Sequence, residues 1–285
     1  MMSTMELEGL CTDAPPSVTR CLWSPGRWAI SLASLLVASC GHFPPDRGGD
    51  APQDAPAPPD AAIEGLVAWY PMDVPPMTDG TFVDASRNGH DGTCDPDLGQ
   101  CPKWDGGAYT FDGVDDWFKV ESKPELGGEQ GFTIMGWFHC IQNQHVCIVN
   151  KGYGSSDENS WQACLDGMMK LEFISSDFNT LIHDMHDPVD TAQWHHLALS
   201  WNGSTTKTTT KTKTILFDGH PTSVDGVDIA FDDADITIGS DIHLSTGQPD
   251  SPFKGQIADV RIYNRALPNS DIRDIMKLSP RYPPQ

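Results

Sequence analysis

The chain has 285 residues and a formal net charge of −22, from 18 basic and 40 acidic side chains. Such an acidic surface repels phosphate backbones, so the composition argues against nucleic-acid binding. The length leaves room for one domain of about 200 residues together with shorter extensions.

The first 39 residues have the features of an export signal. Arg20 and Arg27 precede an uncharged run over residues 28–39, which is too short to span a bilayer comfortably. The run ends in Val-Ala-Ser-Cys at Cys40, which resembles a bacterial lipobox. In such a site the cysteine is diacylated and becomes the new N-terminus, so we expect Cys40 to anchor the chain in a membrane. The alternative is an ordinary secretory signal with a chance cysteine.

The residues after Cys40 indicate where the anchored protein resides. Gly41 stands where an aspartate would favour retention in the inner membrane, so we expect the outer membrane or the cell surface. Residues 40–62 are rich in Pro, Ala and Asp and have almost no large apolar side chain. Such a stretch cannot bury a core and predicts an extended tether. The folded domain is expected over residues 63–280.

Segments with strand character follow one another through this domain. They alternate apolar and polar side chains or are rich in β-branched and aromatic residues, and turn residues bound them. The expected strands are residues 66–73, 108–113, 114–120, 132–138, 147–152, 161–165, 169–174, 195–201, 214–219, 236–239 and 255–264. One helix is expected after them, because Ile272, Ile275 and Met276 have helical spacing behind possible caps at Asn269, Ser270 or Asp271.

The clearest alternation lies in residues 195–201. Leu197, Leu199 and Trp201 share one face of this expected strand, whereas Ala198 lies on the other face. Large apolar groups on one face need a second apolar surface to cover them. The sequence therefore predicts an all-β protein in which one antiparallel sheet packs on another.

Six ordered motifs give this pattern a family resemblance. They are residues 65–70, Phe-Asp-Gly-Val-Asp-Asp at 111–116, and residues 132–138, 148–152, 193–203 and 253–267. Together they resemble laminin G-like jellyroll domains of the concanavalin A-like lectin/glucanase superfamily, over roughly residues 63–276. The resemblance implies a two-sheet antiparallel jellyroll sandwich with a short C-terminal helix. It does not imply a particular ligand, because one fold carries many functions.

Glucanases of this superfamily place two glutamates two positions apart on one strand, and this chain lacks that motif. Only Glu172 lies within a clear expected strand, and it has no glutamate two positions away. Asp115 and Asp116 are adjacent, so in a strand their side chains would point to opposite faces. We therefore expect a protein that is not an enzyme, with a glycoside hydrolase as the less favoured reading.

The family resemblance also implies a structural calcium ion at the rim of the sandwich. Hard oxygen ligands on turn residues suit this ion, and the candidates are Asp84, Asn88, Asp112 and Asp259. The alternative is that these residues form turns and satisfy their own backbone. His183 and His186 could suggest zinc, but their segment precedes a proline in an expected loop, so a solvated loop is favoured.

Five cysteines remain after Cys40, which allows at most two disulfides in an exported domain. Cys94 and Cys101 enclose six residues of a Gly/Asp/Pro loop and are the safest pair. Cys140 and Cys147 repeat that spacing and are slightly favoured as the second pair. The competing pair joins Cys147 to Cys164, which a hairpin would place opposite each other.

These observations favour a non-catalytic, lipid-anchored surface protein. Its jellyroll domain is expected to bind glycan or an extracellular protein, in adhesion or matrix contact. The alternative is a polysaccharide-active enzyme or an accessory module of one.

Overall fold

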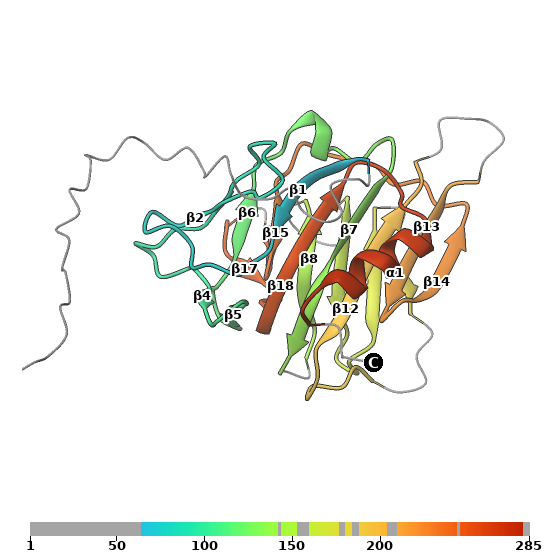
Figure 1. Ribbon diagram of the computed structural model, residues 1–285. Coiled ribbons are helices and arrows are strands. Elements are labelled where there is room, and N and C mark those ends of the chain that lie inside the picture. The colour runs from blue at the N-terminus through green and yellow to red at the C-terminus, as the bar shows by residue number, and fades with distance from the viewer. Residues whose placement is uncertain are drawn as a thin grey trace, which may run out of the picture. The chain divides into compact units, whose positions relative to one another are not determined.

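The alternation of residues 195–201 becomes strand β12, His195–Trp201, which lies inside the first of two antiparallel sheets (Figure 1). The computed structural model describes residues 64–141, 144–152, 160–176, 180–183, 188–203, 210–243 and 246–281. The predicted signal, Cys40 and the tether lie outside these residues. In the part of the chain that is described, no helix has the length and apolar character needed to cross a bilayer.

The first sheet, sheet A, has the strand order β14-β13-β12-β7-β18-β5-β4, and β1 also pairs with β18. Its long central strands are β7, β12 and β18. The bounds are β1 Leu66–Tyr70, β4 Lys103–Trp104, β5 Tyr109–Asp112, β7 Phe132–Cys140, β13 Thr212–Phe217, β14 His220–Asp225 and β18 Lys254–Tyr263.

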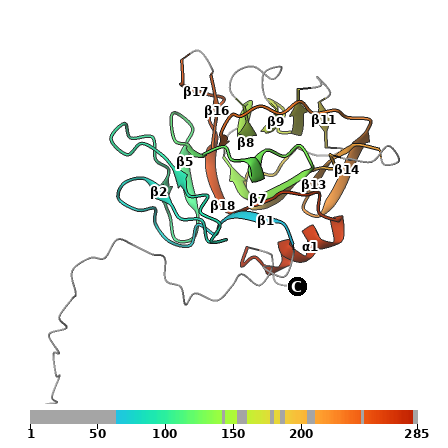
Figure 2. The same ribbon diagram turned by 90° about the horizontal axis from the view of Figure 1, so that it is seen from above.

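The second sheet, sheet B, has the order β11-β10-β9-β8-β15-β6-β3-β2 and lies over sheet A (Figure 2). Its bounds are β2 Thr81–Phe82, β3 Gly92–Thr93, β6 Phe118–Val120, β8 Val146–Lys151, β9 Trp161–Leu165, β10 Leu171–Ser175, β11 Leu181–Ile182 and β15 Ile236–Ile238. A separate pair joins β16, Asp241–Ile242, to β17, Pro249–Asp250, and a 3₁₀ turn spans Pro124–Leu126. The predicted jellyroll sandwich is confirmed.

The core fills the space between the sheets. Leu197, Leu199 and Trp201 are buried there, as their alternation predicts, and Phe132 stacks on Trp161 from the facing sheet with ring centroids 4.8 Å apart. The cavity between the sheets measures about 20 Å³, which holds no more than one water molecule. The interior is therefore filled by side chains, and a ligand site has to lie on an outer face or at the rim.

Helix α1, Asn269–Leu278, covers one part of the outer face of sheet A. Ile272 and Ile275 are buried against Ala198 and Leu216, which form a second apolar cluster on that face. The predicted caps are wrong. The cap position is Pro268, which makes no side-chain hydrogen bond, and its fixed backbone angle leads the chain into the helix instead.

The structure has two disulfides. It joins Cys94 to Cys101, the pair that the sequence favoured, with Cα atoms 5.3 Å apart. The predicted Cys140–Cys147 bond is wrong, because Cys147 is joined to Cys164. The strand pairing explains this. Cys147 and Cys164 are direct partners in the β8–β9 register, whereas Cys140 ends β7 in the other sheet and is buried in the core.

Peptide mapping tests this pairing. Digestion of the exported protein without reductant should yield one cross-linked peptide that holds Cys94 and Cys101 and another that holds Cys147 and Cys164. Alkylation after denaturation should label Cys140. A peptide that links Cys140 to Cys147 would contradict the β8–β9 register.

Candidate functional site

Polar and aromatic side chains cross the open part of the outer face of sheet A in one row. Successive strands place Lys103, Thr110, Gln256 and His139 opposite one another in the β4–β5, β5–β18 and β18–β7 registers. Trp194, just before β12, continues the row, and its ring centroid lies 5.9 Å from that of His139. Neighbouring strands lie about 4.8 Å apart, so the row is about 19 Å long. We call these five residues the cross-strand row.

The cross-strand row is accessible. Lys103 is exposed, and the other four side chains are half-buried. Gln256 donates from Nε2 to Thr110 Oγ1 at 3.3 Å and to Asp105 Oδ2 at 3.1 Å, which fixes its amide across the strands. An indole, an imidazole, an amide, a hydroxyl and an ammonium group in one line can stack on a sugar ring and hydrogen-bond its hydroxyls.

Backbone geometry positions the centre of this row. Gly255, next to Gln256, has φ +150, and a Cβ there would lie 2.1 Å from the carbonyl oxygen of His139. Only glycine permits so close an approach of β18 to β7. Further along β18, the register shifts between Ala258 and Arg261, and Asp259 has φ +52. This bulge turns the Asp259 carboxylate to the outer face of the sheet.

A buried polar layer lies beside the row. Asp259 Oδ1 accepts hydrogen bonds from Trp69 Nε1 at 2.8 Å and from Arg261 Nε at 3.0 Å. The Arg261 guanidinium lies 5.0 Å from the centre of the Trp69 ring. These side chains fix one another, so the layer gives the row a rigid support.

Two ring nitrogens in this layer lack a hydrogen-bond partner among the residues that the structure describes. Trp137 Nε1 and His196 Nδ1 are both buried and unpaired, and their rings meet edge to face with centroids 5.3 Å apart. Burial lowers the pKa of His196 to about 4, and the charges of Asp259 and Asp218 oppose this shift only in part. The imidazole is therefore neutral at neutral pH and keeps an unused hydrogen-bonding position.

Arg281 joins the layer to the row. Its guanidinium stacks 4.5 Å from the Trp194 ring, and Nη2 donates to the carbonyl oxygen of Gly107. Burial lowers the pKa of this guanidinium, and the charge of Asp259 acts in the opposite direction. The contact holds the Trp194 ring in place at the end of the row.

The structure does not gather the four predicted calcium ligands into one site. Asp84 accepts hydrogen bonds from the backbone amides of Trp69, Ser86 and His90. Asp259 is paired with Arg261. Among the described residues, Asp84, Asp112 and Asp259 do not form a group that shares a metal-ligand distance. Local donors contact Asp84 and Asp259, which is the arrangement that the turn-forming alternative describes.

Asn88 and Asp112 act in separate turns. Asn88 Nδ2 donates to the carbonyl oxygens of Leu66 and Val67. Asp112 Oδ1 accepts from Val114 N at 2.8 Å, and Asp116 Oδ2 accepts from Asp112 N at 2.8 Å.

Asp112 does meet other carboxylates. Asp112, Asp115 and Asp116 have carboxylate oxygens within 4.8 Å of one another, because residues 113–117 form a turn. The expected strand over residues 114–120 begins only at Phe118, so the expectation that adjacent side chains point apart does not apply. Burial raises the pKa of Asp116 to about 6, with the charges of Asp112 and Asp115 in the same direction. This spacing is shorter than the roughly 5–9.5 Å of paired glycosidase carboxyl groups.

The histidines of the expected loop and the first histidine of β12 have different surroundings. In the expected loop, His183 lies within the described residues and His186 lies outside them. His183 Nδ1 lies 2.6 Å from Thr222 Oγ1. His195 Nδ1 contacts Asp218 Oδ2 at 2.8 Å, and its ring packs on Phe217. These contacts give His195 a structural role at the start of β12.

The cross-strand row was not predicted from the sequence. Its residues lie up to 153 positions apart, from Lys103 to Gln256, and β4 is too short to show a strand pattern. Trp194 and Gln256 lie within two separate motifs that the sequence singled out, residues 193–203 and 253–267. The pairing of β18 with both β5 and β7 brings the others together.

This architecture defines a two-sheet jellyroll domain. The chain matches the family described as the concanavalin A-like lectin/glucanases superfamily over residues 112–273, which is more than half of its length. The chain belongs to this family. No curated protein sequence matches it.

Solved structures share the fold at low sequence identity. Trypanosoma rangeli sialidase is 15% identical with a TM-score of 0.53, over 73% of this chain and 32% of the sialidase chain. Domain 4 of AbnA, a GH43 extracellular arabinanase from Geobacillus stearothermophilus in complex with arabinotriose, is 20% identical with a TM-score of 0.52, over 74% of this chain and 98% of that domain.

A third similar structure is the ligand-binding domain of botulinum neurotoxin serotype D in complex with N-acetylneuraminic acid. It is 14% identical with a TM-score of 0.51, over 75% of this chain and 50% of that domain. This chain spans about a third of the length of the sialidase. At these identities the likeness concerns the fold alone.

The buried imidazole predicts a pH dependence of stability. His196 has a folded pKa of about 4, below the roughly 6.5 of an unfolded histidine, so its contribution is complete above pH 6.5 and is lost as the pH falls towards 4. The loss is about 3 kcal/mol of unfolding free energy. Thermal denaturation between pH 7 and pH 4 should show that His196→Leu loses less stability than the parent. The exposed His220→Leu variant should behave like the parent, and equal slopes for all three would contradict a neutral buried His196.

Proposed function

We propose that this protein is a glycan-binding module displayed on a bacterial surface. The observation that carries the proposal is the cross-strand row, which presents Trp194, His139 and Gln256 on an accessible face of sheet A. Two structures with the same fold support it, since one holds arabinotriose and another holds N-acetylneuraminic acid. The proposed ligand is a chain of several sugar units, because the row is about 19 Å long.

The row offers the groups that sugar recognition uses. The Trp194 ring can stack on the apolar face of a sugar, and Gln256 Oε1 can accept hydrogen bonds from ring hydroxyls while its Nε2 stays bonded to Thr110 and Asp105. The Asp259–Arg261 pair and the neutral His196 hold the sheet rigid behind them. Rigid aromatic and amide groups lose little conformational freedom on binding, which favours affinity.

Binding assays test the row. The full-length protein with Cys40→Ser should bind members of a polysaccharide panel, and Gln256→Ala should weaken the affinity about fivefold, which corresponds to about 1 kcal/mol for one hydrogen bond. Trp194→Ala should weaken it at least tenfold, because it also removes the stacking surface. Calorimetry or a glycan array measures both.

Glu172→Gln is the matched control, because Glu172 lies on β10 of sheet B. It should bind as the parent does. A loss of affinity in Glu172→Gln with none in Gln256→Ala would place the site on the other sheet. Unchanged binding in both row variants would exclude the row.

The second candidate function is cleavage of the bound polysaccharide. The Asp116 carboxyl, with its pKa raised to about 6, is the group that favours it, and Asp112 lies two positions beyond Thr110 on β5. The same assay distinguishes the two functions. Binding without new reducing ends supports a non-catalytic module, whereas reducing ends that disappear in Asp116→Asn establish an enzyme.

The proposed surface location rests on the lipobox at Cys40. Two acyl chains give stable membrane attachment, whereas the uncharged run over residues 28–39 is too short to hold the protein alone. Cys40→Ser should therefore move the protein from the outer-membrane fraction to the soluble fraction. Immunoblotting of fractions washed with salt measures this, and a variant that stays in the membrane would refute the lipid anchor.

A further inference from the structure

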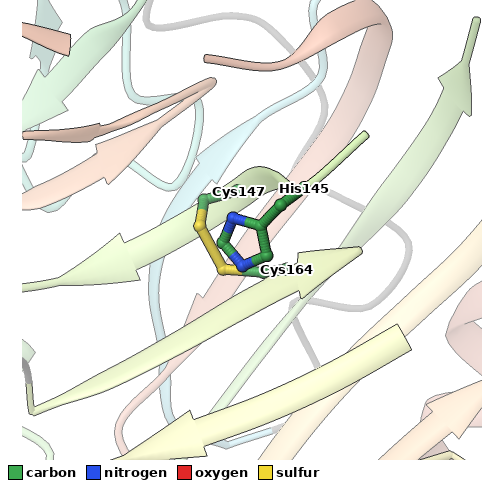
Figure 3. Close-up of side chains that lie close together, drawn as sticks. All are labelled: His145, Cys147 and Cys164. Carbon is green, nitrogen blue, oxygen red and sulfur yellow. A yellow bond between two sulfur atoms is a disulfide. The ribbon is translucent and has the colours of Figure 1, made fainter. Parts of the chain in front are cut away.

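The outer face of sheet B carries a second group of side chains that the proposed glycan site does not use. His145, Cys147 and Cys164 lie together there, with the imidazole beside the Cys147–Cys164 disulfide (Figure 3). One ring nitrogen and both sulfurs lie within 4.8 Å of one another. His145 is exposed, whereas the two cysteines are buried beside it.

The fold builds this arrangement. Cys147 and Cys164 are paired partners of β8 and β9, and His145 lies two positions before Cys147. Ser251 contacts both His145 and Cys147. Its carbonyl oxygen accepts a hydrogen bond from Cys147 N at 2.8 Å, and its Oγ lies 3.0 Å from His145 Nδ1. Metal-bound histidines commonly have one ring nitrogen held by such an oxygen while the other nitrogen faces the metal.

We propose that His145, Cys147 and Cys164 bind one Zn²⁺ ion when their disulfide is reduced. Two thiolates and one imidazole form a ligand set that suits Zn²⁺, and three protein ligands leave a fourth position open to water. In a tetrahedral site with Zn–S bonds of about 2.3 Å, the sulfurs lie about 3.8 Å apart. The Cα atoms of the two cysteines lie 4.0 Å apart, so the proposed site needs only rotation of the two side chains and no movement of the strands.

The chemistry requires a dithiol as reductant. Its two thiols supply two electrons and two protons and become a disulfide, while the Cys147–Cys164 bond breaks and yields two thiols. Zn²⁺ then displaces both thiol protons to solvent and forms two Zn–S bonds. The oxidised and the metal-bound forms therefore exclude each other, and the site reports the redox state around the protein.

Zinc titration of the full-length protein tests the proposal. Cys94→Ser and Cys101→Ser form the background, so that reduction acts on one disulfide only. The protein is treated with a dithiol, desalted without oxygen and titrated with Zn²⁺, and bound zinc is measured by atomic absorption. We expect one zinc per reduced chain and none per oxidised chain. Co²⁺ should give sulfur-to-cobalt charge-transfer absorption in the reduced chain only.

Variants define the ligands. Cys164→Ser should weaken zinc binding at least 100-fold, and His145→Ala at least tenfold. Glu172→Gln is the matched control, because Glu172 pairs with Cys164 in the β9–β10 register but lies outside the three-residue group. A loss in Glu172→Gln as large as in Cys164→Ser would overturn the assigned ligands.

Two other results would overturn the proposal itself. One is equal zinc binding by the oxidised and reduced chains. The other is a reduced chain that takes up no zinc. This result overturns the proposal if near-ultraviolet circular dichroism shows that the reduced chain is folded. It also does so if the reduced chain unfolds and added zinc does not restore the signal.

Discussion

The pairing of β7 with β12 on one side and β18 on the other is the constraint on which the rest of the structure depends. Register in these three strands decides which side chains enter the core and which reach the outer face. Leu199 lies opposite Ile134, and both side chains enter the core. Ala198 lies opposite Met135, and both belong to the apolar cluster that helix α1 covers. A slip of one residue would exchange the two faces and destroy both apolar clusters.

The same pairing supports the face that we propose as a glycan site. The bulge at Asp259 interrupts β18 between two regular stretches, so Gln256 and Arg261 both reach the outer face although five positions separate them. The Arg261–Asp259 pair and the Trp69 ring occupy the space that the bulge creates. Asp259 therefore adopts an unfavourable backbone conformation, which costs about 1–3 kcal/mol of folding free energy. This conformation holds the polar layer against the sheet.

Sequence reasoning reached the strands because their side-chain period is local. Nearly every strand of four or more residues was predicted within a few positions, but β14 was not. Its residues are mostly polar and largely exposed, so no row of large apolar side chains marks one of its faces. The second disulfide required the β8–β9 register, which spacing between cysteines does not contain. The cross-strand row required the order of strands in sheet A. Asp84, Asn88, Asp112 and Asp259 were predicted as calcium ligands, with turn formation as the alternative, and only the structure shows that their partners are backbone amides, carbonyls and an arginine.

Strand β14 ends sheet A, and its composition decides how this edge meets another molecule. Pro221 within it has no amide hydrogen, and polar side chains such as His220 and Thr222 surround that position. An edge of this kind pairs poorly with a strand from another molecule, because donors are missing and the flanking side chains favour water. Two copies of this domain therefore have little tendency to join their sheets through this edge, so each sheet A stays a separate unit when copies meet.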